Sequence, residues 1–274
     1  MKVYRLRNVS YRYPTGEWAL RGINMEVEKG ETLAVVGPNG AGKTTLLKLM
    51  DALIMPTEGE ILFEGRPITE KTMTEREFRR KVGFLFQNPD VMLFSATVLE
   101  DVAFGPVHLW GKERGIERAR KELEKLGIEE LADRHPYSLS GGEKKKASIA
   151  CVTSMEPEVL LLDEPTRDLD LRNRNFVLDM IRNWKMEGRT VVVVTHDLRL
   201  IRLADRVYVI NKEVLFEGTP RELFSKPELI ERANLDVPEI VRLFHMLGIN
   251  EIPLSVEEAA EILRGFIRER EKGL

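Results

Sequence analysis

Residues 31–47 read ETLAVVGPNGAGKTTLL, and this stretch decides the fold. The apolar run 33–36 is typical of a buried strand, and the apolar spacing after Lys43 is typical of a helix. GPNGAGKT at 37–44 fits the phosphate-binding loop pattern, in the strand–helix context that the pattern requires. Glycines let backbone N–H groups turn toward an anion, and the helix start adds its positive dipole end. We predict a loop that binds a nucleoside triphosphate; the alternative is a glycine-rich turn without a ligand.

Two side chains at the end of this loop have expected roles. Lys43 is expected to reach the β- and γ-phosphates, and the hydroxyl of Thr44 is expected to take one coordination position of Mg²⁺. The residues expected to surround the phosphates are Gly37, Pro38, Asn39, Gly40, Ala41, Gly42, Lys43, Thr44 and Thr45.

The composition restricts the classes of protein to consider. The chain has 274 residues, enough for one large domain or for a domain with an appendage. Its formal net charge of -3 gives no sign of the basic surface that binds nucleic acid. One cysteine, Cys151, excludes an intramolecular disulfide. The N-terminus lacks the apolar core of a signal peptide, and no apolar run approaches about 18 residues. We therefore expect a cytosolic chain that reaches a membrane only through a partner.

Polar residues follow two further apolar runs. VLLLDEP at 159–165 ends in Asp163, the position at which phosphate-loop enzymes hold a metal ion. A second carboxylate beside it is repelled unless Mg²⁺ is present, so we assign Glu164 as general base for the water that attacks the γ-phosphate. His196 follows the run 190–195, at the sheet edge where open α/β folds bind ligands. A lone histidine is usually structural, but this position favours contact with the ligand.

Two side chains have two interpretations each. Gln87 ends the apolar strand 82–86, where a glutamine can contact the metal or the attacking water, although such a residue is more often part of a loop. Tyr13 precedes the turn at Pro14 and either offers its ring to a nucleotide base or packs on the sheet. These residues by themselves leave both alternatives open.

A second glycine-opened helix start lies at 138–150. Ser140 is a candidate N-cap and Glu143 its capping-box partner, with Gly141 and Gly142 between them. The three lysines at 144–146 place cations in the first turn, against the helix dipole. A nearby polyanion such as a phosphate group would relieve that conflict; a solvated face is the alternative.

The remaining patterns predict an α/β fold with three additions to a phosphate-loop NTPase core. Strands at 3–11 and 20–27 indicate an antiparallel β flap, and a helical subdomain is expected at about 88–155. We place the boundary of the ATPase domain at 1–218. Residues 219–274 are short helices punctuated by prolines, which we interpret as a helical extension that packs on the core or mediates dimerisation.

Two helices are expected within the helical subdomain. Residues 97–110 have helical apolar spacing, and exposed Leu93, Phe94 and Trp110 nearby would form a docking patch, although core packing is the commoner fate of such residues. Residues 113–126 alternate charges at helical spacing, which is typical of a solvated surface helix.

Taken together, the motifs resemble those of the ATP-binding cassette (ABC) ATPases. The resemblance covers about the first 218 residues and rests on four motifs in the family's order: GPNGAGKTT at 37–45, LSGGE at 139–143, VLLLDEP at 159–165 and VVVVTHD at 191–197. Two further stretches, FQNPDVMLF at 86–94 and VAFGP at 102–106, resemble the ATPases of energy-coupling-factor and cobalt-type importers. The resemblance implies hydrolysis of ATP with Mg²⁺, at the cytoplasmic face of the cell membrane, to energise import of a metal ion or a vitamin.

The resemblance also implies a head-to-tail dimer, with itself or with a second ABC ATPase, and two ATP molecules at the interface. Each ATP is held by one subunit's phosphate loop and by the helix start at Ser140, Gly141 and Gly142 of the other. Transmembrane subunits would sit near Gln87 and the helix 97–110, and closure on ATP would drive them.

By the same resemblance, individual residues acquire roles. Tyr13 stacks on adenine, and His196 contacts the γ-phosphate beside the base Glu164. Asp163 holds the metal through water, and Gln87 senses Mg²⁺ and the membrane partner. The residues implied at the metal are Thr44, Gln87 and Asp163, and Asp170 belongs to the nucleotide site across the interface.

The sequence departs from the family in two places. Arg167 and Asp168 stand where relatives usually carry small residues, which puts communication across the interface through that loop in doubt, although Asp170 is retained. Lys146 stands where many relatives have arginine.

Three other functions compete with that of a transporter motor. The first is a soluble ABC ATPase that acts in DNA repair, protein assembly or translation. Repair members carry long coiled-coil insertions and translation members carry two cassettes, and this chain has neither. A nucleotide-gated interaction module with little turnover is disfavoured by intact Glu164 and His196. A phosphate-loop kinase would leave the motif at 139–143 unexplained.

Overall fold

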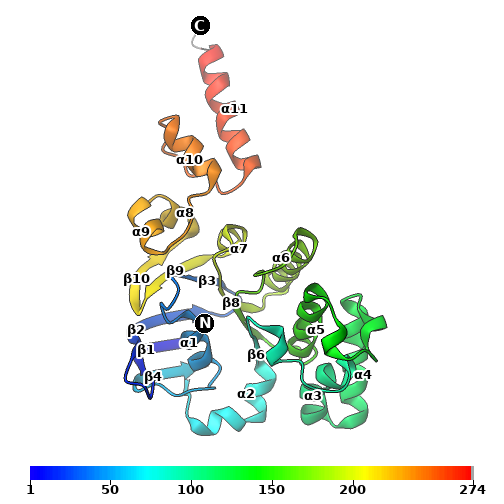
Figure 1. Ribbon diagram of the computed structural model, residues 1–274. Coiled ribbons are helices and arrows are strands. Elements are labelled where there is room, and N and C mark those ends of the chain that lie inside the picture. The colour runs from blue at the N-terminus through cyan, green and yellow to red at the C-terminus, as the bar shows by residue number, and fades with distance from the viewer. Residues whose placement is uncertain (273–274) are drawn as a thin grey trace.

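A computed structural model describes residues 1–272, and its strands form two sheets (Figure 1). The larger sheet has the order β10-β9-β3-β8-β7-β6. Its central strands β3, β7 and β8 are mostly aliphatic and fully buried, because both faces of the sheet are covered. The bounds are β3 Thr32–Val36, β6 Val82–Leu85, β7 Val159–Asp163, β8 Thr190–Val194, β9 Arg206–Asn211 and β10 Glu213–Gly218. β9 and β10 form the only antiparallel pair of this sheet within residues 1–272, turning at Lys212, whose φ is 62°.

The smaller sheet is the antiparallel flap, with the order β2-β1-β4-β5. Its strands are β1 Lys2–Arg12, β2 Trp18–Glu28, β4 Glu58–Phe63 and β5 Arg66–Pro67. The hydroxyl of Tyr4 donates to the carbonyl oxygen of Met50 over 3.0 Å, and this buried bond ties the flap to the end of α1 (Lys43–Met50). The predicted α/β core with an antiparallel flap is therefore confirmed.

Three helices, α3, α4 and α5, lie together to one side of the larger sheet (Figure 1). They span Val98–Trp110, Lys112–Lys125 and Gly141–Thr153. A short 3₁₀ turn at Pro89–Val91 precedes α3, and two more, at Glu129–Leu131 and Pro136–Ser138, lie between α4 and α5. Thr97 caps α3 and Ser140 caps α5, each through a capping box that satisfies free N–H groups of the first turn.

Two sequence-based expectations about this group of helices are wrong. Leu93 is only 4% exposed, because it joins the hydrophobic core with Val98 and Val102, whereas Phe94 beside it is 65% exposed. Helix α4 is not solvated all round: Ala119 and Leu123 are fully buried, which makes it a half-buried amphipathic helix.

The C-terminal helices begin where the hairpin ends. Leu223 and Phe224 of α8 are fully buried in the same hydrophobic cluster as Val207 and Val209 of β9. Helices α10 and α11 lie farther from the sheets than α8 and α9 (Figure 1). The remaining helices are α2 Arg76–Lys81, α6 Leu171–Met186, α7 Leu198–Leu203, α8 Pro220–Phe224, α9 Pro227–Arg232, α10 Glu239–Met246 and α11 Val256–Lys272, and Glu70–Thr74 is a further 3₁₀ turn. Among the described residues, no helix has the length and apolar character needed to cross a bilayer.

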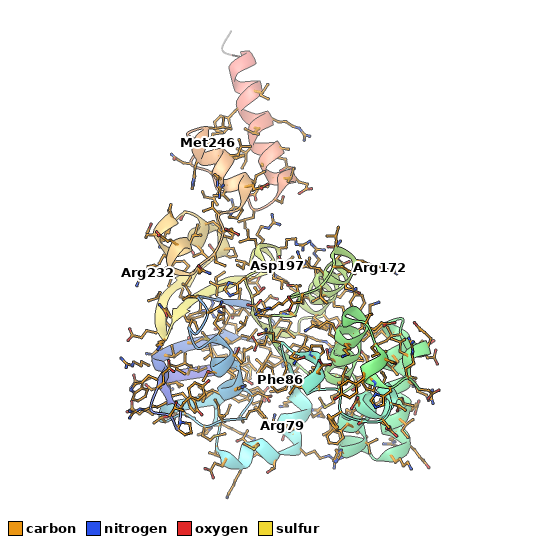
Figure 2. The ribbon with its side chains drawn as sticks, viewed as in Figure 1. Arg79, Phe86, Arg172, Asp197, Arg232 and Met246 are labelled. Carbon is orange, nitrogen blue, oxygen red and sulfur yellow. The ribbon has the colours of Figure 1, made fainter. Side chains whose placement is uncertain are left out.

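A buried ion pair joins α2 to the end of α1. Arg79, labelled in Figure 2, donates over 2.9 Å to a carboxylate oxygen of Asp51, which is 4% exposed, and over 2.8 Å to the Asp51 carbonyl oxygen. Burial raises the pKa of Asp51 to about 6, and the guanidinium of Arg79 opposes that rise. The pair therefore keeps a buried carboxylate charged at neutral pH.

We expect Arg79→Met to lower the free energy of unfolding at pH 8 by ~3 kcal/mol, because it leaves a buried charge without a partner. Without Arg79 the pKa of the buried Asp51 should rise further above about 6, so the cost should shrink as the pH falls toward 6 and should be smallest at pH 5, where Asp51 is largely protonated in both folded proteins. Urea denaturation of the variant and of the unaltered chain, at pH 8 and at pH 5, measures the loss of unfolding free energy at each pH. Arg80→Met, at an exposed position of the same helix, serves as control with a change within about 0.5 kcal/mol. Equal losses for the two variants would contradict the role of the pair.

Candidate nucleotide-binding site

The loop between β3 and α1 requires glycine at two of its positions. Gly37 lies so close to β9 that a Cβ atom there would be 2.0 Å from the carbonyl oxygen of Ile210. Gly42, immediately before α1, has a φ of 94°, and a Cβ atom there would be 2.4 Å from the carbonyl oxygen of Ala19. These two glycines therefore let the loop pack closely against β9 and β2, and residues 39–45 of the loop line a cavity in which N–H groups can face an anion.

Lys43 bends back across this loop. Its Nζ atom donates to the carbonyl oxygens of Gly37 over 2.6 Å and Pro38 over 3.0 Å, and it lies 3.3 Å from Nε2 of His196. Burial lowers the pKa of Lys43, and the carboxylates of Glu164 and Asp163 oppose that shift. The ammonium group of Lys43 thus lies among the atoms that would face the phosphates.

Thr44 and Asp163 form a pair of oxygen ligands suited to Mg²⁺. The Thr44 hydroxyl donates to Oδ2 of Asp163 over 2.7 Å. Oδ1 of Asp163 is buried and, within the part of the chain that the structure describes, has no hydrogen-bond partner. Burial raises the pKa of Asp163, while Thr44 and Lys43 lower it. A hard cation prefers such oxygens and would satisfy the unpaired one, so the residues fit Mg²⁺.

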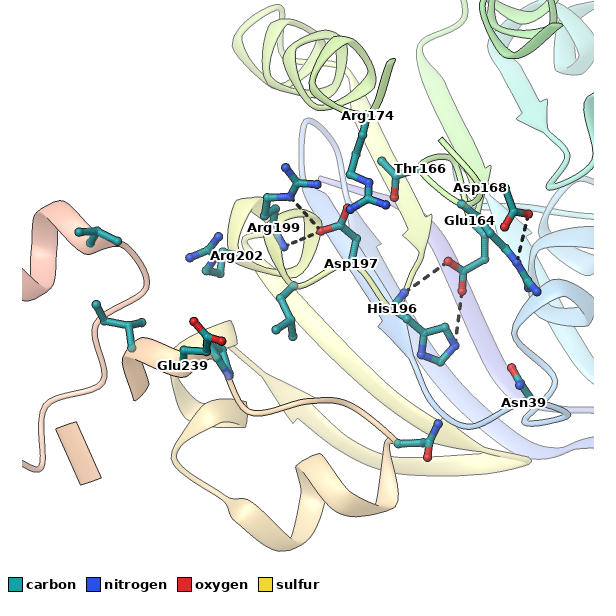
Figure 3. Close-up of a pocket in the computed structure, with 16 residues that line it drawn as sticks. Asn39, Glu164, Thr166, Asp168, Arg174, His196, Asp197, Arg199, Arg202 and Glu239 are labelled. Atoms are coloured by element: carbon teal, nitrogen blue, oxygen red, sulfur yellow. Dashed lines mark hydrogen bonds and ion pairs between the residues drawn. The ribbon is translucent and has the colours of Figure 1, made fainter. Parts of the chain in front are cut away.

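Glu164 and His196 lie side by side at the ends of β7 and β8 (Figure 3). The backbone N–H of His196 donates to Oε2 of Glu164 over 3.4 Å, and the imidazole Nε2 lies 3.4 Å from Oε1. Burial raises the pKa of Glu164, which makes it a better proton acceptor. Burial, helped by the charge of Lys43, lowers the pKa of His196 and favours the neutral imidazole at pH 7.

Glu164 also has an unusual backbone. Its φ is 44°, in the left-handed region that residues other than glycine seldom adopt, although its side chain is buried. Such strain is concentrated at functional sites, where the surrounding structure holds it. No residue pattern in the sequence indicates this conformation.

A cavity of about 330 Å³ brings most of the predicted residues together. Tyr13 lies at its edge, and its hydroxyl is 2.7 Å from Oγ1 of Thr45; Gln87 reaches it from the end of β6. Gly37 and Pro38 do not line this cavity, but their carbonyl oxygens accept hydrogen bonds from Lys43. His196 lines a neighbouring cavity of about 830 Å³. The predicted residues that line the smaller cavity are Tyr13, Asn39, Gly40, Ala41, Gly42, Lys43, Thr44, Thr45, Gln87, Asp163 and Glu164.

Four predicted residues lie elsewhere. Ser140, Gly141 and Gly142 begin α5, and Asp170 caps α6 through a bond of 2.8 Å from the backbone N–H of Asn173. A Cβ atom on Gly142 would lie 2.2 Å from the side-chain nitrogen of Asn173. The starts of α5 and α6 therefore meet at Asn173, a contact that the sequence analysis missed.

The loop after Glu164 contains Arg167 and Asp168, two of the three residues that depart from the family. Asp168 has a φ of 59°, and aspartate tolerates this left-handed conformation better than most residues do. Arg167 lines both cavities and lies 3.6 Å from Oδ2 of Asp168. Asp168 thus takes the left-handed turn position without a glycine, and Arg167 adds a cation beside Glu164.

Each of the three lysines near the start of α5 has a partner within the chain. Lys144 Nζ donates to Oδ1 of Asp90 over 2.7 Å, and Lys145 Nζ donates to the carbonyl oxygen of Gln87 over 3.0 Å. Lys146 lies over the ring of Phe176, 4.7 Å from its centroid. Neither a phosphate nor a solvated face is needed to explain them, and for Lys145, which is 3% exposed, the solvated face is wrong.

The sequence was also compared with known proteins. The ABC transporter family model matches residues 20–167. A putative ABC transporter ATP-binding protein of Methanocaldococcus jannaschii is 53% identical, over 96% of this chain and 97% of its own length. The energy-coupling factor transporter ATP-binding protein EcfA of Methanothermobacter thermautotrophicus is 44% identical, over 92% of this chain and 84% of its own.

Solved structures agree with these relatives. The structure of cbiO1 from Clostridium perfringens, part of the ABC transporter complex cbiONQ, has a TM-score of 0.73 at 37% identity, covering 90% of this chain and 99% of that chain. A dimeric ATP-binding cassette in a post-hydrolysis state with ADP and Pi has a TM-score of 0.73 at 30% identity, covering 80% and 99%. The chain therefore belongs to the ABC transporter family, as an ATPase subunit homologous to the ATP-binding subunits of energy-coupling-factor transporters.

Proposed function

We propose that this chain is the motor subunit of an importer of the energy-coupling-factor type, which takes up a metal ion or a vitamin. Residues 1–218 form its ATPase domain, with a helical subdomain at about 88–155, and 219–274 form a helical extension. The chain works at the cytoplasmic face of the cell membrane and is held there by transmembrane subunits. The observation that carries the proposal is the set of contacts around one phosphate-binding loop: Lys43 with His196, His196 with Glu164, and Thr44 with Asp163.

Each residue of the site has a proposed part in hydrolysis. Mg²⁺, when bound between Thr44, Asp163 and Gln87, would neutralise charge on the β- and γ-phosphates. Lys43 binds the same phosphates, and Glu164 accepts a proton from the attacking water. Neutral His196 orients the γ-phosphate, and Tyr13, exposed at the cavity edge, stacks on the adenine ring.

The site is completed by a second subunit in this proposal. Ser140, Gly141, Gly142 and Asp170 lie outside the cavity of their own chain, and the capped start of α5 offers N–H groups of the kind that bind anions. A head-to-tail dimer, with an identical chain or a second ABC ATPase, brings these groups to the partner's ATP. The dimeric cassette with ADP and Pi supports this arrangement.

The surface proposed to dock the transmembrane subunits consists of Phe94, Phe104 and His108. Phe94 is 65% exposed and Phe104 52% exposed, and their rings meet edge to face with centroids 5.3 Å apart. The ring of His108 lies 4.6 Å from that of Phe104. An exposed aromatic cluster is suited to bind an apolar helix of a membrane subunit.

We expect Phe94→Asp to release the chain from the membrane fraction and to abolish co-purification of transmembrane subunits, because a charge would be buried in the interface. ATP binding by the purified variant should remain unchanged. Affinity purification from detergent-solubilised membranes, with identification of the bound chains, measures this result. Met186→Asp changes an exposed side chain at the end of α6 and serves as control. If the unaltered chain binds no membrane subunit, it is a soluble ABC ATPase instead.

A further inference from the structure

The turn after Glu164 holds Arg167 beside the nucleotide site. The Glu164 N–H donates to the Val194 carbonyl oxygen over 2.9 Å, and the Arg167 N–H donates to the Glu164 carbonyl oxygen over 3.2 Å. Thr166, between them, is only 3% exposed. The backbone of Arg167 is therefore tied through Glu164 to the end of β8, whereas its side chain is 54% exposed.

The guanidinium of Arg167 has only a weak partner within the chain. Its one ion pair among residues 1–272 is with Asp168, at 3.6 Å, which is longer than a hydrogen bond. Both side chains are more than half exposed, and an exposed pair of this kind contributes little to stability. The guanidinium can therefore exchange Asp168 for a stronger anion at little cost.

The charges of the smaller cavity leave a place for a second cation. Lys43 and Arg167 are the two cations among the described side chains that line it, and Glu17, Asp163 and Glu164 are its carboxylates. The ammonium of Lys43 already donates to two carbonyl oxygens of the loop. Mg²⁺ would offset Asp163, but Glu164 would still repel the charge of a γ-phosphate beside it. Arg167 is placed to reduce that repulsion.

The charge of Arg167 also acts on both residues assigned to the γ-phosphate. Arg167 lines the larger cavity together with Glu164 and His196. Burial raises the pKa of Glu164, and the charge of Arg167 is among those that oppose this rise. Burial lowers the pKa of His196, and the charges of Lys43 and Arg167 lower it further. A phosphate group between Glu164 and His196 would therefore lie within the field of this guanidinium.

We propose that Arg167 is a ligand of the γ-phosphate of the ATP bound by its own chain. The guanidinium leaves Asp168 and donates to γ-phosphate oxygens, to which its planar fork of N–H groups is suited. ADP lacks this phosphate, so Arg167 makes the site prefer ATP to ADP. The inference rests on the proposed function, because it requires that the cavity binds ATP.

A chain that cannot pair isolates this contact within one subunit. Gly141 is exposed, and a Cβ atom there would meet nothing within 4 Å, so Gly141→Glu should fold normally. Its carboxylate would repel the partner's ATP in the proposed dimer and keep the chain monomeric, which light scattering checks. Isothermal titration of this variant with Mg²⁺–ATP and with Mg²⁺–ADP gives its preference for ATP. Adding Arg167→Met should weaken ATP binding about fivefold and keep ADP binding within about twofold, because an exposed, charge-assisted contact to one phosphate is lost.

Two further changes in the Gly141→Glu chain separate a ligand from a residue that only orders its loop. Arg172→Met removes an exposed arginine of α6, labelled in Figure 2, that lines neither cavity, and both affinities should stay within about twofold. Asp168→Asn keeps the left-handed turn but removes the competing carboxylate, so the preference for ATP should be retained or should rise.

Three results would overturn the assignment of Arg167. They are unchanged ATP affinity in the Arg167→Met chain, equal losses for ATP and ADP, and a loss of preference in Asp168→Asn equal to that in Arg167→Met. The last result would mean that the ion pair with Asp168 only orders the loop. Absence of ATP binding by the unaltered chain would overturn the proposed function, and this inference with it.

Discussion

Replacing Glu164 with glutamine is expected to reduce ATP hydrolysis by ~10²–10⁴-fold while ATP binding is retained. The carboxylate follows β7 directly and contacts His196, and burial raises its pKa toward that of an effective base. Glutamine keeps the shape and the hydrogen bond from the His196 N–H but cannot accept the proton of the attacking water. The loss should therefore appear in kcat.

The same variant should form a stable dimer in the presence of Mg²⁺–ATP, because the step that reopens the interface is blocked. Phosphate release gives the rate, and size-exclusion chromatography with light scattering gives the mass. Near-normal hydrolysis would exclude Glu164 as base. A monomer at high protein concentration with ATP bound would contradict the two-chain site. Glu187→Gln, at an exposed acidic position after α6, is the control for loss of a carboxylate.

Replacing Lys43 with alanine is expected to weaken ATP binding by about 100-fold, because a partly buried ammonium loses its contact with the phosphates. Its position inside the loop, bonded to the carbonyl oxygens of Gly37 and Pro38, gives it access to those phosphates. Isothermal titration with ATP measures the change. Lys125→Ala, at an exposed position of α4, should bind ATP within about twofold of the unaltered chain. Unchanged affinity in Lys43→Ala would exclude this lysine as a phosphate ligand.

The fold could be predicted largely because its decisive signals are local. The run 33–36, the loop glycines and the helix after Lys43 are adjacent in sequence, and so are the strands and turn of the hairpin at Lys212. Caps are equally local, and the capping box at Ser140 and Glu143 is present as predicted.

What the sequence could not reveal depends on contacts between distant residues. Lys145 meets Gln87, and Lys144 meets Asp90, across more than fifty residues, so charge pattern alone assigned these lysines to phosphate or solvent. Leu93 and Phe94 are adjacent and equally apolar, but only the packing of α3 decides that Leu93 is buried. The backbone strain at Glu164 also arises from tertiary structure.

The position of β3 inside its sheet has a consequence for biosynthesis. This strand comes early in the chain, but both of its neighbours, β8 and β9, are translated more than 150 residues later. Until the ribosome has released them, the nascent polypeptide carries an aliphatic strand with two unpaired edges, which is an aggregation hazard. ATP therefore has no finished pocket to enter until most of the ATPase domain has been synthesised.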